Sequence, residues 1–209
     1  MRPNKKLKNI IEAALLAAGG PLSLDGLQSL FDEENKPGKK ILKQILGELK
    51  NDYDGRGIEI VEVASGWRIQ VSEDTSPMIA SLWSERPLRY SRALMETLAI
   101  IAYRQPITRG EIEDIRGVSV SSNIIKTLQE RDWVKEVGYR DVPGRPSLLA
   151  TTREFLDYFN LKTVDELPPL AEIRDFETIN QELNFNEIDE GDEFSEKEHK
   201  GIETSSTSG

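Results

Sequence analysis

The chain has 209 residues, of which 37% are hydrophobic and 31% are charged, and it contains no cysteine. This composition excludes disulfides, thiolate catalysis and zinc sites built on cysteine. The net charge of -10 is concentrated in residues 171–209, which hold 3 Lys and Arg against 12 Asp and Glu. The preceding part is therefore close to neutral and has no surplus of positive charge for binding nucleic acid.

The sequence offers few groups for catalysis or for membrane insertion. Its one histidine, His199, lies in the acidic tail, so no Ser-His or His-metal arrangement is expected in the folded part. There is no phosphate-binding glycine loop, and we expect no enzyme activity and no cofactor. No apolar run approaches the ~18 residues that cross a bilayer. The start of the chain also lacks the features of a signal peptide, so we expect a cytoplasmic protein.

The first copy of an internal repeat begins with an amphipathic helix over residues 7–18, which ends at Gly19-Gly20. Ser23 is placed to cap a short second helix, and a third helix follows over residues 41–49. Alternating apolar residues over 58–71, with a turn at Ser65-Gly66, predict a half-buried hairpin. Ser76-Pro77 is then expected to cap a connector helix that runs to about Trp83.

The second copy follows the same order. Ser91 is expected to cap a helix over 94–102, and Thr108 with Glu111 forms a capping box for the next helix, which Gly117 ends. A third helix follows the segment 119–122. A hairpin is expected over 133–150 with a loop at 140–147 that two prolines stiffen, and Thr151 with Glu154 predicts a capping box for a final helix.

The two copies share a run of proline, an apolar residue and a hydroxyl residue, with further apolar residues at identical spacing: Pro21, Leu22, Ser23, Leu27 and Leu30, then Pro106, Ile107, Thr108, Ile112 and Ile115. Ile107, Ile112 and Ile115 have the spacing of core residues. Three helices and a hairpin are the order of a winged helix. The prediction is a mainly α protein with small β-hairpins (α+β), built as two tandem winged-helix domains.

The expected organisation has four parts. Residues 1–74 form the first domain, 75–90 a connector helix and linker, 91–170 the second domain, and 171–209 an acidic tail. The tail has too few apolar residues to offset the entropy of ordering, so it is expected to be largely disordered.

Several motifs of the second copy resemble bacterial segregation and condensation protein B. They are the segment 102–118 (AYRQPITRGEIEDIRGV), then 128–131 (LQER), 144–146 (GRP), 151–156 (TTREFL) and the closing Leu167-Pro168. The resemblance spans roughly residues 7–170 and is densest in the second copy.

The resemblance implies a non-catalytic subunit of the condensin-like SMC-kleisin complex, which supports chromosome condensation and partition during cell division. Members of that family are homodimers that bind the kleisin, segregation and condensation protein A, and reach the SMC ATPase through it. They dimerise through the first domain and meet the kleisin largely through the second. The expected location is the cytoplasm, with association to the nucleoid through the complex.

Seven polar and aromatic residues of the second copy are candidates for the partner-binding surface: Tyr103, Arg104, Arg109, Arg116, Tyr139, Arg140 and Arg145. Arg145 has no structural role visible in the sequence, so it either pairs with an acidic kleisin segment or faces water. Thr108 and Glu111 are explained by the capping box alone.

The alternative is a tandem winged-helix DNA-binding transcriptional regulator, because this fold commonly places its third helix in the major groove. Lys36, Lys39, Lys40 and Lys43 cluster where the third helix of the first copy begins. Acidic residues stand beside this cluster, which favours a solvated face of mixed charge. Weak or indirect DNA contact remains compatible with either function.

Overall fold

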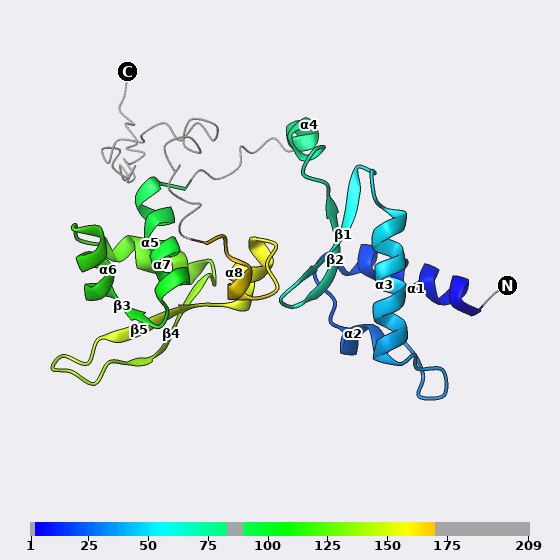
Figure 1. Cartoon of the computed structure of the whole chain (residues 1–209), viewed down its shortest axis with the longest axis horizontal. Helices are drawn as coiled ribbons and strands as arrows, with labels where there is room; N and C mark the ends of the chain where they lie inside the picture. The colour runs from blue at the N-terminus through cyan, green and yellow to red at the C-terminus, as the bar shows by residue number, and fades with distance from the viewer. Residues whose placement is uncertain (1–2, 83–89, 170–209) are drawn as a thin grey trace, which may run out of the picture.

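The computed structural model describes residues 3–82 and 90–169, which form two units of similar build (Figure 1). The predicted tail, residues 171–209, and the predicted end of the connector at Trp83 lie outside the described residues. Helices and small antiparallel sheets make up both units, as the mixed α and β prediction requires.

In the first unit, three helices precede a hairpin: α1 (Pro3–Ala18), α2 (Leu24–Gln28), α3 (Lys39–Asp52), β1 (Ile58–Val63) and β2 (Gly66–Val71). Gly19 follows α1 with a φ of 63°, and the Ser23 side chain accepts a hydrogen bond from the amide of Gly26. The helices and β1 bury one apolar cluster, formed by Ile11, Leu15, Leu27, Leu42, Ile45, Leu46, Leu49 and Ile60.

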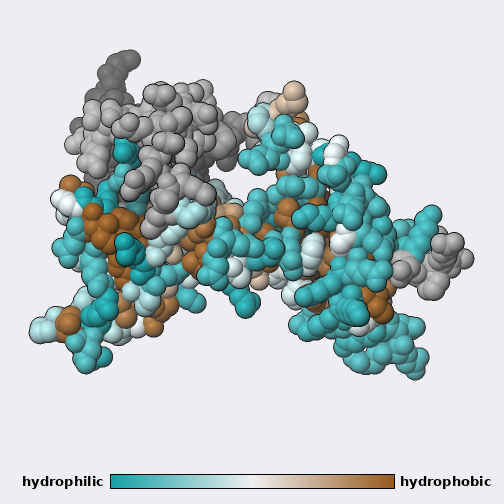
Figure 2. All heavy atoms as spheres, viewed as in Figure 1, coloured by the Kyte–Doolittle hydropathy of each residue, from teal (hydrophilic) through white to brown (hydrophobic). Residues whose placement is uncertain are grey.

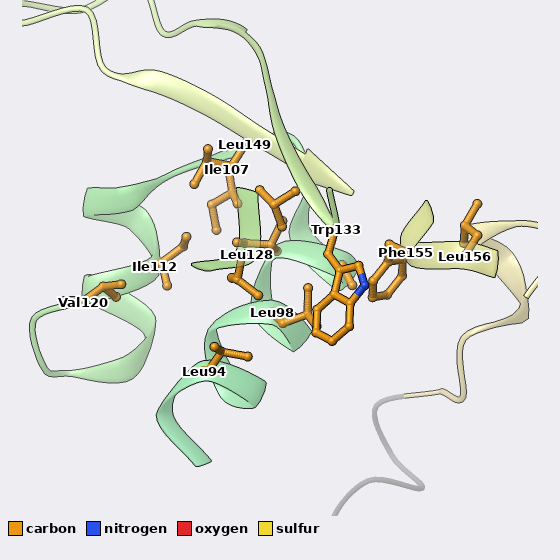
Figure 3. Packing of buried hydrophobic residues seen from close by; sticks show 13 residues of the cluster. Leu94, Leu98, Ile107, Ile112, Val120, Leu128, Trp133, Leu149, Phe155 and Leu156 are labelled. Atoms are coloured by element: carbon orange, nitrogen blue, oxygen red, sulfur yellow. The ribbon is translucent and has the colours of Figure 1, made fainter. Parts of the chain in front are cut away.

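The second unit adds a short strand and a final helix to the same order: α5 (Arg92–Arg104), β3 (Ile107–Thr108), α6 (Arg109–Arg116), α7 (Ser122–Glu130), β4 (Val134–Tyr139), β5 (Ser147–Thr151) and α8 (Arg153–Tyr158). A 3-10 turn follows at Val164–Glu166. The caps of α5 at Ser91 and of α6 at Thr108 and Glu111 are confirmed, as is the left-handed Gly117 that ends α6. Trp133 and Phe155 lie side by side in the core of this unit, which Figure 3 shows.

Strand β3 was not predicted, and it turns the expected hairpin into a three-stranded sheet of order β3-β5-β4. Ile107 pairs with Leu149 in this sheet. The first unit has the equivalent contact as an isolated bridge, in which Leu22 and Trp67 exchange hydrogen bonds of 2.8 and 2.9 Å. The repeat therefore extends to the pairing of the backbone.

Equivalent apolar positions of the two copies also have the same burial. Leu27 and Ile112 are fully buried at equivalent positions, whereas Leu30 and Ile115 are both 53% exposed. The expectation that Ile115 is a core residue is therefore wrong. Ile115 lies three residues after Ile112, which rotates it by about 60° from the buried line of α6.

Two helices have their N-cap one residue away from the position that the sequence predicted. Helix α4 (Ser76–Ile79) has Thr75 as its N-cap, and it continues as a 3-10 turn over Ala80–Leu82. Helix α8 is capped by Thr152, whose side chain accepts from the amide of Phe155. Thr151 is unavailable because its amide and hydroxyl both donate to the Gln105 side chain, at 2.7 and 2.9 Å, and keep it in β5.

The two units meet where the turn between β1 and β2 reaches the C-terminal end of α8 (Figure 1). Ala64 of this turn packs against the apolar cluster of the second unit.

Candidate partner-binding site

A shallow hollow of about 370 Å³ lies in the second unit, where the end of α5, the start of α6 and the end of β4 come together. We call it the α6 hollow. Its lining consists of Arg104, Pro106, Ile107, Glu111, Asp114, Ile115 and Arg140. Two of the seven predicted site residues, Arg104 and Arg140, therefore share one surface feature.

Glu111 organises this hollow. Its carboxylate accepts from the amide of Thr108 at 2.8 Å, which completes the capping box of α6. The same carboxylate accepts two bonds from Nη2 of Arg140, at 2.5 and 2.7 Å. The Arg140 guanidinium, helped by the Thr108 amide, lowers the pKa of Glu111 to about 2. The capping box alone does not explain Glu111, because its carboxylate also holds Arg140 in place.

The second cation of the hollow, Arg104, is not held by an ion pair among the described residues. Arg104 is the last residue of α5, its side chain is exposed, and it forms no hydrogen bond or ion pair with another residue of 3–82 or 90–169. Asp114 likewise has no ion-pair partner among the residues the structure describes. The hollow thus combines one fixed guanidinium with one that is free to pair with an incoming carboxylate.

The hollow also has an apolar side. Ile107 is buried beneath it, and Ile115 and Pro106 are exposed at its surface. Figure 2 shows hydrophobic atoms reaching the surface in both units among mostly hydrophilic residues. An exposed isoleucine and two arginines that line one hollow are suited to a partner segment that carries both apolar and acidic side chains.

Tyr139 and Arg145 lie on the β4–β5 hairpin, beyond the hollow. Tyr139 is 60% exposed, and the Arg145 guanidinium lies 5.8 Å from the centre of its ring. The loop is closed by hydrogen bonds from the amide of Arg140 to the Pro146 carbonyl and from the amide of Arg145 to the Val142 carbonyl, both 2.9 Å. These bonds hold the exposed aromatic and cationic side chains on an ordered loop.

Arg109 and Arg116 are occupied by contacts within the unit. Arg109 donates to Glu113 and to the Ser122 hydroxyl, each at 3.0 Å, and so ties α6 to the start of α7. Arg116 pairs with Glu96 at 3.3 Å, and its side chain is only 10% exposed. Both arginines therefore connect neighbouring helices.

Tyr103 is the fifth predicted site residue that lies outside the hollow. Its hydroxyl donates to the carbonyl of Pro168 at 2.5 Å, which holds the end of the described chain against α5. Burial raises the pKa of this hydroxyl above its ordinary value.

Five lining residues of the hollow were not predicted as site residues: Pro106, Ile107, Glu111, Asp114 and Ile115. Their spacing gave no separate indication, since Ile115 fits the core pattern of the repeat.

Neither a metal site nor a membrane-spanning helix is found in the described parts of the chain. No cluster of three or more His, Asp or Glu side chains there is arranged to hold a metal ion. None of the helices within 3–82 and 90–169 combines the length and apolar character needed to span a membrane.

Comparison with known proteins gives a consistent result. The family described as "Segregation and condensation complex subunit ScpB" matches residues 9–170. A relative from Coxiella burnetii, "Segregation and condensation protein B homolog", is 56% identical over 180 residues, which cover 86% of this chain and 85% of the relative.

Two solved structures are also similar in sequence. The crystal structure of ScpB from Mycobacterium tuberculosis is 29% identical, with a TM-score of 0.36 over 77% of this chain and 99% of that one. A dimer of an ScpB N-terminal domain complexed with an ScpA peptide is 28% identical, with a TM-score of 0.34 over 38% of this chain and 96% of that one.

Proposed function

Because the chain belongs to the family of ScpB subunits of segregation and condensation complexes, we propose that it is the kleisin-binding subunit of an SMC-kleisin complex. In this function it binds the kleisin, segregation and condensation protein A, and reaches the SMC ATPase through it. The complex supports chromosome condensation and partition during cell division. The chain acts without catalysis, in the cytoplasm and at the nucleoid.

The fold supports this function as a pair of tandem winged-helix domains. Each unit has three helices followed by a hairpin, and each has a backbone bridge from the segment before its second helix to that hairpin. The proposed boundaries, 1–74 and 91–170, are drawn around these two sets of elements. In this arrangement the first domain serves dimerisation and the second serves kleisin binding.

The first domain is proposed to form a homodimer. It is small, and a single core of this size leaves apolar surface uncovered. Leu16 on α1 is 70% exposed, and Leu30 after α2 and Ile41 on α3 are exposed as well. A second copy of the chain would cover this surface.

The observation that carries the proposal for the second domain is the α6 hollow. It places the exposed Ile115 beside Arg140, which Glu111 fixes, and Arg104, which has no partner within the described residues. Tyr139 and Arg145 extend this surface along the hairpin loop. Because Glu111 already holds Arg140 in place, docking of a partner segment costs little further side-chain entropy at this arginine.

Calorimetric titration of the kleisin into the full chain tests this placement. Arg104→Ala and Ile115→Ser are each expected to weaken binding about tenfold, or ~1.4 kcal/mol, and the pair Tyr139→Ala with Arg145→Ala by a similar factor. Val118→Ser is the matched control, because Val118, two residues after α6, is similarly exposed but does not line the hollow.

Two results would contradict the placement. If the hollow and loop variants all bind normally while changes at Leu30 abolish binding, the kleisin site lies on the first domain. If Val118→Ser weakens binding as much as Ile115→Ser, the hollow is not the specific contact.

The ion pairs disfavour the alternative function of DNA-binding regulator. Lys36 pairs with Glu33 at 2.9 Å and Lys39 with Asp25 at 2.6 Å, so half of the lysine cluster is neutralised. A DNA-binding surface would show steep loss of affinity with salt, because phosphate contacts release counterions. DNA affinity that falls steeply with salt and is removed by Lys40→Ala with Lys43→Ala would favour the regulator instead.

A further inference from the structure

Three hydrogen bonds between described residues cross the contact between the two units, beside the apolar packing of Ala64. The amide of Ala64 donates to the Leu161 carbonyl at 2.9 Å, and the amide of Ser65 donates to the Asp157 carboxylate at 2.9 Å. A third bond joins the Arg68 guanidinium to the Asn160 side-chain oxygen. All three donors belong to the first unit and all three acceptors to the second, so the two surfaces are complementary.

The acceptors are presented by the way α8 ends. Asn160 has a left-handed φ of 57°, and the amide of Leu161 returns to the Leu156 carbonyl at 2.8 Å. This is the geometry of a Schellman motif, in which asparagine replaces the usual glycine. The motif holds the side chains of Asp157 and Asn160 and the carbonyl of Leu161 at one corner of the unit.

Asp157 is poorly placed for its own helix. It lies in the last turn of α8, where the helix dipole disfavours a negative charge. Its carboxylate forms its hydrogen bond with the Ser65 amide, 92 residues away in the sequence. The stability of helix α8 therefore does not explain why an aspartate occupies position 157, whereas its hydrogen bond to the first unit does.

The donors are held as firmly as the acceptors. Directly after Ser65, the backbone of Gly66 and Trp67 passes against Leu22, and Trp67 exchanges two hydrogen bonds with Leu22. A Cβ at Gly66 would lie 2.2 Å from the Leu22 carbonyl oxygen, so only glycine fits this path. The turn between β1 and β2 is thus anchored on its own unit on one side and on α8 on the other.

The Arg68 side chain is also fixed before it reaches the second unit. Its Nε donates to Gln70 at 3.0 Å, and the Gln70 amide donates to Glu59 on β1 at 2.9 Å. This chain of bonds across the hairpin orients the guanidinium toward Asn160.

We propose that this contact is an interunit latch: the hairpin turn docks on the Asp157–Asn160 corner and holds the two units in one relative orientation, and its release lets them reorient. The latch does not depend on which partner the chain binds. Small polar contacts between domains permit relative motion. Each hydrogen bond shifts the docking equilibrium by about five- to tenfold, so the latch is specific and reversible.

Hydrogen exchange on the full chain tests the docking directly. In the docked form, the amides of Ala64 and Ser65 are hydrogen-bonded and exchange slowly, whereas in a free turn both face water. Asp157→Ala and, from the other side, Arg68→Ala are each expected to speed their exchange about tenfold. Glu154→Ala is the matched control, since Glu154 is an exposed carboxylate on the same helix without a role in the contact.

Distances between the units test the orientation. The chain lacks cysteine, so spin labels can be attached at Lys43→Cys on α3 and Lys126→Cys on α7, with excess unlabelled protein added to dilute any second copy. The expected result is one narrow distance distribution that broadens in Asp157→Ala and in Arg68→Ala but not in Glu154→Ala. Circular dichroism confirms that each variant is folded.

Two outcomes would overturn the latch. In one, the turn amides of the unmodified chain exchange at the rate of a free turn. In the other, both latch variants remain folded and keep the narrow distance distribution of the unmodified chain.

Discussion

Glu111 joins helix α6 to the hairpin loop of the second unit, and its removal should destabilise this unit measurably. In Glu111→Ala, the amide of Thr108 loses its carboxylate acceptor and Arg140 loses both of its bonds. Loss of a capping interaction costs about 1 kcal/mol, and a partly exposed ion pair contributes up to about 1 kcal/mol. We therefore expect the free energy of unfolding to fall by about 1 to 2 kcal/mol.

Glu111→Gln separates these two contributions. The amide oxygen of glutamine still accepts from Thr108, but the side chain has no charge for Arg140, so the expected loss is below about 1 kcal/mol. A double-mutant cycle with Arg140→Ala should give a coupling free energy of about 0.5 to 1 kcal/mol for glutamate and a smaller one for glutamine.

The same contact makes stability depend on pH. The pKa of Glu111 is about 2 in the folded chain, below its ordinary value of 4.5. Because the folded-state pKa is the lower one, the carboxylate stabilises the fold above about pH 4.5 and loses this contribution as the pH falls toward 2. The difference between the unmodified chain and Glu111→Gln should therefore narrow over this interval.

Urea denaturation of the full chain, followed by circular dichroism and by tryptophan fluorescence, measures these free energies. Glu130→Ala is the matched control, because Glu130 pairs with Lys126 at 3.5 Å on an exposed helix face and caps nothing. Equal losses for Glu111→Ala and Glu130→Ala, or zero coupling between Glu111 and Arg140, would refute the reasoning.

Further measurements test the first unit. Gly66→Ala should lower the free energy of unfolding by about 2 kcal/mol or more, because its Cβ would clash with the Leu22 carbonyl. Gly20→Ala, where the space is open, should change it by about 0.5 kcal/mol at most; a similar cost for both would contradict this account. Leu16→Glu with Leu30→Glu should convert the proposed dimer to a monomer in light scattering, whereas a dimer that persists would place the interface elsewhere.

The elements that the sequence predicted correctly depend on local chemistry. A hydroxyl before an apolar helix satisfies free amides wherever the helix packs, so the caps at Ser23, Ser91 and Thr108 could be located from the sequence. The position of Gly117 followed from the need for a left-handed residue after α6.

The wrong or missing elements depend on contacts between distant segments. Thr151 has the local pattern of a cap, but Gln105, 46 residues earlier, holds it in β5. Strand β3 has only two residues, too few for an alternating pattern, and it exists because it pairs with β5.

The candidate site shows the same limit. The resemblance of the sequence to a family was enough to name these arginines as candidate site residues. The role of each arginine, however, depends on the residues that surround it in the fold. Arg116 and Arg109 are paired with Glu96 and Glu113, whereas Arg104 has no such neighbour within the residues that the structure describes. Composition and spacing do not reveal which cation is paired, because an ion pair depends on distances that only the fold sets.

The equivalent exposure of Leu30 and Ile115 has an evolutionary consequence. If the two units arose by duplication, the ancestral domain already had one apolar position, at or just after the end of its second helix, that the core did not constrain. Each copy could then acquire a different partner by substitutions around that position without repacking its interior. One inherited apolar position outside the core would thus have allowed the two units to bind different partners independently.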